Sequence, residues 1–155
     1  MESTTTFDRC VYCFSAKNTG EECPRCGYSV ELCEQPGWWL PPGTVLKGRY
    51  LVGKNRDSNP HWIRYLGWDL ERSRTVDITE YFPAGLVTRD ITSSNDVVTV
   101  PGCKDRVEKG QQTFLEKAKL FYDCVHGVEK DTVMDFFLRN NTCYYALHRQ
   151  ERETK

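Results

Sequence analysis

The stretch Val76-Asp-Ile-Thr-Glu-Tyr-Phe-Pro83 decides the fold of this chain. Apolar residues alternate with polar ones from Val76 onward, which is typical of a half-buried β-strand. Proline cannot donate the backbone hydrogen bond that a sheet ladder needs, so Pro83 ends the run. The stretch therefore predicts a strand that leaves its sheet at Pro83, with Thr79 near its centre.

Composition limits the chain to one medium domain, or to one small domain with an added module. The 155 residues carry a net charge of −1, so nothing global indicates nucleic acid or a membrane as a partner. No apolar run approaches the roughly 18 residues of a membrane span, and no secretory signal is visible at the N-terminus. We therefore expect a cytoplasmic, reducing setting, where eight cysteines favour metal ligation or buried thiols over disulfides.

Two Cys-x-x-Cys pairs, Cys10/Cys13 and Cys23/Cys26, lie close together near the N-terminus. Four thiolates form the tetrahedral set that a structural Zn²⁺ prefers, and a two-residue spacer lets both sulfurs of a pair face one ion. The spacing predicts a small zinc ribbon with one structural zinc. Four unrelated thiols or two disulfides remain the alternative. Cys33 is either a spare ligand or a semi-buried thiol.

The cysteine pattern and a Pro-rich segment divide the chain into three predicted parts. They are the zinc ribbon at residues 1–36, a stiff linker at 37–43 and a second domain at 44–155. Trp38 and Trp39 of the linker are candidates for docking the ribbon onto the second domain. The ribbon holds three basic and six acidic residues, which disfavours contact with nucleic-acid phosphates.

The second domain shows short strand patterns on both sides of one helical pattern. We expect strands at Leu46–Val52, Trp62–Trp68, Arg74–Glu80, Thr132–Leu138 and Thr142–Leu147, and an amphipathic helix at Glu108–Phe121. Residues 84–103 are rich in Thr, Ser, Asn and Asp, which predicts a long loop with one short strand at Val97–Val100. The fold class is therefore α+β, with a five-stranded antiparallel sheet packed by one long helix.

Several stretches of the chain also carry a family resemblance. They are Leu40–Lys54, Tyr65–Asp69, Val76–Asp90, Phe114–Lys119 and Asp135–Phe137. Together they resemble the small lobe of bacterial Ser/Thr (Hanks-type) protein kinases that carry an N-terminal zinc ribbon. The resemblance runs from about Cys10 to Leu147 almost without gaps, and it implies the kinase small-lobe fold.

The ion pair that holds ATP in that family is replaced in this chain. The resemblance places the ATP-contacting lysine of the third strand at Thr79, and its glutamate partner on the helix at Lys117. Threonine and lysine cannot form that ion pair. A swapped arrangement, in which Lys117 itself reaches the phosphates, is the alternative.

The phosphate-binding loop of the family has also lost its glycines. Their positions fall on Asp57, Asn59, Pro60 and Trp62. Glycines let backbone N–H groups approach phosphates closely, whereas Pro60 has no N–H, Trp62 is bulky and Asp57 repels phosphate. The sequence also contains no H-R-D or D-F-G motif, so we expect neither catalysis nor bound ATP.

These losses predict a non-catalytic, pseudokinase-like adaptor or regulator. Its expected partner is a protein, either a kinase or a second copy of the chain, and its expected docking surface is an exposed side of the sheet near Tyr144–Leu147. Three alternatives remain: a zinc-ribbon nucleic-acid-binding protein, a residual nucleotide binder, and a truncated kinase remnant without a selected role. Among the other cysteines, Cys103 is a candidate reactive thiol in the loop, while Cys124 and Cys143 are predicted core thiols.

Overall fold

The computed structural model describes residues 10, 13–14, 38–90, 95–128 and 134–148. Eight strands and one helix follow one another within these residues. In chain order they are β1 (Val45–Leu46), β2 (Tyr50–Ser58), β3 (Trp62–Asp69), β4 (Arg74–Tyr81), β5 (Val87–Arg89), β6 (Val97–Thr99), α1 (Lys104–Val128), β7 (Met134–Arg139) and β8 (Thr142–His148).

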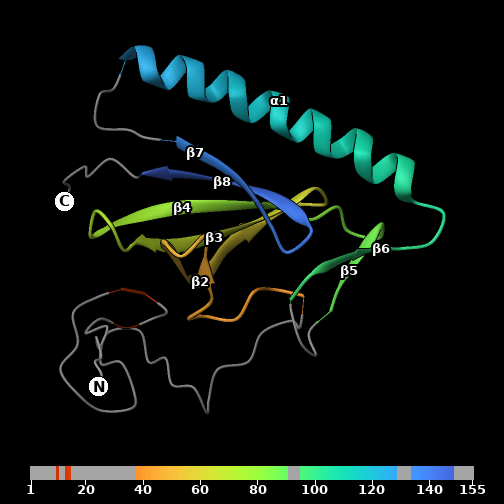
Figure 1. Ribbon diagram of the computed structural model, residues 1–155, viewed down its shortest axis with the longest axis horizontal. Helices are drawn as coiled ribbons and strands as arrows, with labels where there is room; N and C mark the ends of the chain where they lie inside the picture. Colours follow the sequence, from red (N-terminus) through yellow and green to blue (C-terminus); the bar gives the residue numbers. More distant parts are fainter. Residues whose placement is uncertain (1–9, 11–12, 15–37, 91–94, 129–133, 149–155) are drawn as a thin grey trace.

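Six of these strands form one antiparallel sheet in the order β1-β2-β3-β4-β8-β7, with α1 on the β7–β8 side (Figure 1). The predicted antiparallel sheet with one long helix is confirmed for the described residues, but the predicted number of five strands is wrong. Lys47 and Gly48 adopt φ angles of 59° and 66°, and the Arg49 N–H donates to the Leu46 carbonyl at 3.0 Å. Two successive left-handed residues form a tight hairpin turn, so β1 folds back on β2 instead of continuing it.

The predicted long loop at 84–103 is also only partly correct. The short strand expected at Val97–Val100 is present as β6, but it pairs with a second strand, β5, in a separate two-stranded sheet. The helix is longer than expected, because α1 begins at Lys104. Asp105 in its first turn complements the positive end of the helix dipole.

Register divides the side chains of the large sheet between two faces. Residues directly opposite each other on neighbouring strands point to the same side, and successive residues alternate. We call one side the packed face, with Val52, Ile63, Tyr65, Val76, Ile78, Glu80, Tyr144 and Ala146. We call the other side the helix face, with Leu51, Trp62, Arg64, Leu66, Trp68, Asp77, Thr79, Tyr81, Cys143, Tyr145 and Leu147.

The segment before β1 and the β5–β6 hairpin cover the packed face. Leu40, Val87 and Val97 are buried there in one continuous apolar core, and Trp39 packs against it. The Leu40 N–H also donates to the Tyr65 hydroxyl at 3.1 Å. Trp39 and Leu40 of the predicted linker therefore contribute to the core. Full burial of each such apolar side chain contributes about 1.5–3 kcal/mol.

Helix α1 covers part of the helix face. Its Phe114 ring lies 5.4 Å, between centroids, from both the Tyr81 and the Tyr145 ring. The Tyr81 hydroxyl donates to the Val107 carbonyl at 2.8 Å, and Gly110 leaves the space that this hydroxyl occupies. The described part of the chain contains no helix that is long and apolar enough to cross a membrane.

Candidate functional site

Thr79 lies at the middle of the helix face, where a cavity opens in the sheet. It pairs with Arg64 of β3 on one side and with Tyr145 of β8 on the other. These three residues, with Asp77 and Leu147, line a cavity of about 380 Å³. The Thr79 side chain is buried and carries no charge, so among the described residues the cation that lines this cavity is Arg64.

The charges around this cavity are paired with one another across the strands. Arg64 lies 3.6 Å from a carboxylate oxygen of Asp57, and its guanidinium stacks 4.6 Å from the centroid of the Trp62 ring. Arg56 lies 3.4 Å from a carboxylate oxygen of Asp77. Asp57 belongs to strand β2 and not to a loop. The helix face therefore holds two cross-strand ion pairs at the position where the family resemblance implies a nucleotide.

The turn between β2 and β3 lies where the family resemblance implies a phosphate-binding loop. Its backbone N–H groups are bonded within the turn itself. The Asn59 N–H donates to the Trp62 carbonyl at 3.0 Å. The Asn59 side-chain oxygen accepts from the N–H groups of His61, at 2.8 Å, and Trp62, at 3.0 Å. Pro60 has no N–H to offer. Every backbone N–H of these four residues is therefore already donating within the turn.

The same turn is also attached to the chain that leaves β4. The Ala84 N–H donates to the Pro60 carbonyl at 2.8 Å, and the Phe82 N–H donates to the His61 carbonyl at 3.0 Å. These bonds use the carbonyls of the turn as well as its N–H groups. The sequence predicted the loss of glycines at this position, but the attachment to Phe82 and Ala84 depends on a long-range contact that no local pattern indicates.

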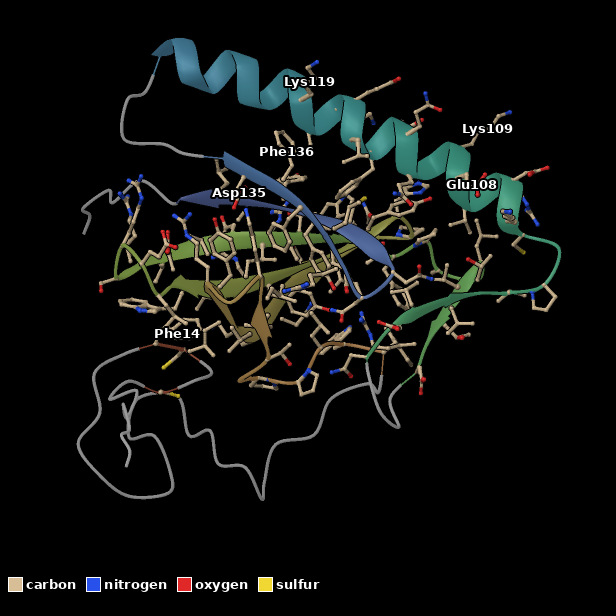
Figure 2. All side chains as sticks on the ribbon, viewed as in Figure 1. Phe14, Glu108, Lys109, Lys119, Asp135 and Phe136 are labelled. Carbon is tan, nitrogen blue, oxygen red and sulfur yellow. The ribbon has the colours of Figure 1, made fainter. Side chains whose placement is uncertain are left out.

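Lys117 does not join this site. Its side chain is exposed, whereas Phe114 and Ala118 form the buried side of α1. Figure 2 shows Lys109 and Lys119 of the same helix, which likewise point away from the sheet. The structure thus brings Asp57 and Thr79 together around Arg64 and leaves Lys117 outside the cavity.

The first cysteine pair forms a tight turn against the sheet. The Phe14 N–H donates to the Cys10 carbonyl at 2.8 Å, and Phe14 adopts a φ of 64°, the left-handed region usually reserved for glycine. A turn of this kind fits a Cys-x-x-Cys pair whose two sulfurs face one ion. Cys23, Cys26 and Cys33 lie outside the described residues, and the residues that are described contain no cluster of three candidate metal ligands.

Phe14 holds this turn on the helix face, at the end farthest from the helix (Figure 2). Its buried ring packs with Leu51, Leu66 and Trp68, and its centroid lies 5.9 Å from that of Trp68. The predicted metal-binding segment is therefore in contact with the same face that carries the Thr79 cavity.

A buried network on the packed face was not foreseen from the sequence. The Glu80 carboxylate accepts from Arg89 at 2.6 Å, from the Tyr65 hydroxyl at 2.8 Å and from the Tyr144 hydroxyl at 2.5 Å. Burial lowers the pKa of Arg89, but the charge and hydrogen bond of Glu80 more than offset this, so the pKa is raised. Burial, followed by the charge of Glu80, raises the pKa of Tyr65 and of Tyr144 well above the usual range. The network ties β3, β4, β5 and β8 together.

Strand β8 provides only in part the exposed side that the sequence predicted at Tyr144–Leu147. It is an interior strand that pairs with β4 on one side and β7 on the other, and Tyr144 and Ala146 are buried. Tyr145 and Leu147, which point to the helix face, are half-buried and line the Thr79 cavity. The sheet is therefore partly open on this side, although its edge strand is β7 and not β8.

Cys103 and Cys143 of the second domain are both buried. The side chain of Cys124, the other predicted core thiol, lies outside the described part of the structure. Cys103 directly precedes α1 and is 7% exposed, so it does not lie open in a loop as expected. Cys143 is fully buried, as predicted for a core thiol, and burial raises its pKa to about 12. A thiol that stays protonated at neutral pH is a poor nucleophile and metal ligand.

The chain is similar to the apo form of PpkA-294, a fragment of a bacterial Ser/Thr kinase, with a TM-score of 0.62 and 19% identity over 72% of this chain. The fold is kinase-related. The match covers 38% of the neighbour's chain, and at this identity the likeness concerns the fold alone. No family model and no curated protein matches the sequence.

Proposed function

We propose that this chain is a non-catalytic, pseudokinase-like protein that acts as an adaptor or regulator through contacts with another protein. The closed turn at Asn59–Trp62 carries the proposal. A phosphate cradle needs several free backbone N–H groups, and this turn has used all of its own. The cavity at Thr79 supports the same proposal, because Thr79 carries no charge and the Asp57 carboxylate, 3.6 Å from Arg64, would repel a phosphate there.

Binding of Mg·ATP tests the nucleotide part of this proposal. We expect no binding, so the melting temperature should stay unchanged at millimolar Mg·ATP. A bound ligand would be easy to detect, because a ligand at 100 times its Kd adds about 2.7 kcal/mol of stability. The melting temperature of the variant Thr79→Lys should also not respond to Mg·ATP, since the variant restores the cation without freeing the N–H groups of the turn. A nucleotide-dependent rise in the melting temperature of either protein would contradict the proposal.

A residual nucleotide binder is the second candidate, and the presence of Arg64 in the cavity favours it. A guanidinium binds phosphate well, and the Arg64 side chain is 33% exposed. On this alternative, Mg·ATP raises the melting temperature of the wild-type chain, and Arg64→Ala abolishes that rise. Leu138→Ala is the control, because Leu138 is exposed on β7 and does not line the cavity.

We further propose that Cys10, Cys13, Cys23 and Cys26 hold one structural Zn²⁺ in a reducing, cytoplasmic setting. The turn from Cys10 to Phe14 supports the first half of this ligand set. Metal analysis should find about one zinc per chain, and a Cys10→Ser/Cys13→Ser double variant should lose it. The matched control Cys103→Ser should retain the metal. Zinc that survives in the double variant would argue against this ligand set.

The partner is a protein, and both a kinase and a second copy of this chain are candidates. Affinity capture with mass spectrometry tests the first, with the Cys10→Ser/Cys13→Ser variant as a control for the ribbon. Sedimentation over a hundredfold range of concentration tests the second. A strict monomer that captures no protein reproducibly would count against the adaptor proposal.

A further inference from the structure

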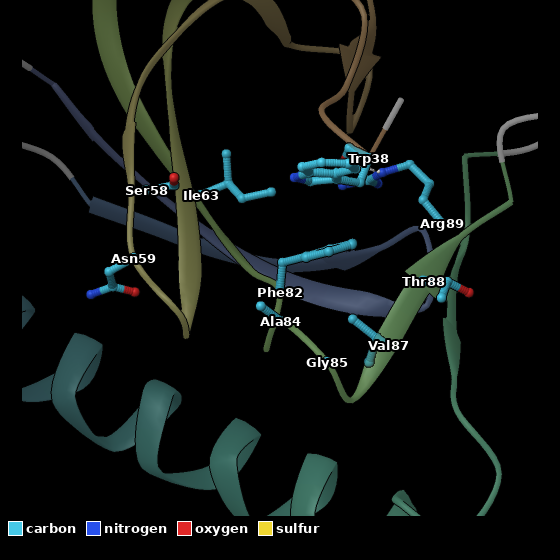
Figure 3. Close-up of a pocket in the computed structure, with 10 residues that line it drawn as sticks. All are labelled: Trp38, Ser58, Asn59, Ile63, Phe82, Ala84, Gly85, Val87, Thr88 and Arg89. Carbon is cyan, nitrogen blue, oxygen red and sulfur yellow. Dashed lines mark hydrogen bonds between the residues drawn. The ribbon is translucent and has the colours of Figure 1, made fainter. Parts of the chain in front are cut away.

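The chain that precedes β1 is attached to the large sheet on both of its sides. On the packed-face side, the Trp38 carbonyl accepts a hydrogen bond from Arg89 at 2.8 Å, and Figure 3 shows the two residues next to each other. On the helix face, Phe14 is 2% exposed and lies in an apolar cluster. Both described ends of the segment that includes Cys23 and Cys26 are therefore held on the sheet.

Phe14 packs on side chains that two neighbouring strands present together. Leu51 of β2 and Trp68 of β3 lie directly opposite each other in the register, and Leu66 lies two residues before Trp68, on the same side of β3. These three residues and Phe14 form one cluster, whereas Phe114 of α1 belongs to a different one. Phe14 is therefore the member of this cluster that the sheet itself does not supply.

The position of the Phe14 ring depends on the turn that the first cysteine pair forms. Phe14 directly follows Cys13, its N–H donates to the Cys10 carbonyl at 2.8 Å, and its φ is 64°. A bulky residue rarely adopts this conformation, which persists only where the surrounding structure holds it. Cys10 is itself fully buried. Cys10 and Cys13, when they share one metal ion, would hold this turn and, with it, the ring.

We infer that Phe14 couples metal binding at the N-terminal cysteines to the stability of the large sheet. The inference rests on the proposed zinc site and adds a consequence for the second domain. With zinc bound, the cysteines hold the turn, and the Phe14 ring keeps Leu51, Leu66 and Trp68 away from water, which favours the folded sheet. Such coupling is reciprocal, so the contact of Phe14 with the sheet also strengthens zinc binding by the same factor. The stability of the second domain therefore responds to the supply of zinc.

The zinc affinity of a full-length Phe14→Ala variant tests this coupling. Competition with a chromophoric chelator should show that the variant binds zinc about 5- to 150-fold more weakly than the wild type, the range typical of coupled sites. Urea unfolding, followed by far-UV circular dichroism, should give a wild-type midpoint that rises with zinc and a lower Phe14→Ala midpoint that rises less. Phe14→Leu keeps part of the apolar contact and should lie between the two proteins in both measurements.

Phe114→Ala is the matched control, because it removes a buried phenylalanine ring from a different cluster. It should lower the urea midpoint but bind zinc like the wild type. An equal loss of zinc affinity in Phe114→Ala would assign the effect to general destabilisation and overturn the coupling. Wild-type zinc affinity in Phe14→Ala would overturn the coupling and leave the zinc site standing. A wild-type chain without zinc in metal analysis would overturn the zinc site as well, so the two failures are distinguishable.

Discussion

The two faces of the large sheet treat their charged residues differently. On the packed face, Glu80 and Arg89 are fully buried and bonded to each other. On the helix face, Arg64 and Asp57 form a longer pair that water reaches, with side chains 33% and 54% exposed. Buried pairs are costly to break, whereas exposed pairs contribute little. The packed face therefore maintains the fold, whereas the helix face tolerates replacement of its charged side chains.

Removing the carboxylate of Glu80 should produce the largest loss of stability. Glu80→Ala leaves the Arg89 guanidinium buried without its counter-charge, so we expect the free energy of unfolding to fall by about 3–5 kcal/mol in urea titrations. Glu71→Ala is the control, because its carboxylate is 67% exposed and its loss should cost less than about 1 kcal/mol. Equal losses for the two variants would remove the distinction between buried and exposed charge.

Alkaline pH should weaken the packed face in particular. The pKa values of Tyr65 and Tyr144 are raised by burial and by Glu80, so both phenols stay protonated in the folded chain while those of the unfolded chain ionise near pH 10. Stability is therefore complete below about pH 10 and falls above it, by about 1.4 kcal/mol per pH unit for each tyrosine. Tyr144→Phe should make this decline shallower, as measured by urea unfolding at several pH values. Parallel declines for variant and wild type would show that Tyr144 does not contribute.

Adding a methyl group at Gly67 should cost less than the loss of Glu80 but still destabilise the packed face. A Cβ at Gly67 would overlap the Ile78 side chain in the middle of the sheet, and overpacking of this kind costs about 1–3 kcal/mol. Gly110→Ala on α1 is the counterpart on the other face. The added methyl group would meet the Tyr81 hydroxyl, but the change from glycine to alanine gains about 1 kcal/mol of helix propensity. Thermal unfolding should therefore rank Gly67→Ala as the more harmful change, and the reverse ranking would contradict this account.

The smallest effect should come from the ion pair between Arg56 and Asp77. A double-mutant cycle with Arg56→Ala and Asp77→Ala should give a coupling free energy below about 1 kcal/mol, because both side chains are partly exposed, at 33% and 23%. Added salt should reduce that coupling further. A coupling of several kcal/mol would mean that the helix face is as tightly constrained as the packed face.

Local patterns predicted the parts of the fold that depend on neighbouring residues. The alternation around Thr79 placed it correctly on a strand. Strands β7 and β8 lie where the last two strands were predicted, and a turn at Asn140-Asn141, with φ angles of 51° and 61°, joins them. The Lys47-Gly48 turn was missed because the strand pattern continues on both sides of it. The amphipathic pattern predicted the helix correctly, but it placed the helix at Glu108–Phe121, whereas α1 extends from Lys104 to Val128.

Long-range contacts account for what the sequence did not reveal. Glu80 and Arg89 meet because the β5–β6 hairpin folds over the packed face, and no local spacing indicates that pairing. The lining of the Thr79 cavity depends on the register of β3, β4 and β8, which the sequence leaves undetermined. The zinc site and the absence of catalysis remain predictions, since they rest on residue types and on the family resemblance.

The contact between Phe14 and Trp68 gives the protein a built-in optical reporter. Trp68 is 8% exposed, and Phe14 forms part of the cover that keeps its indole away from water. Any event that lifts the Cys10–Phe14 turn from the sheet would hydrate this indole and shift its emission to the red. In a variant that keeps only Trp68 of the four tryptophans, fluorescence can therefore follow the position of the Cys10–Phe14 turn without a label.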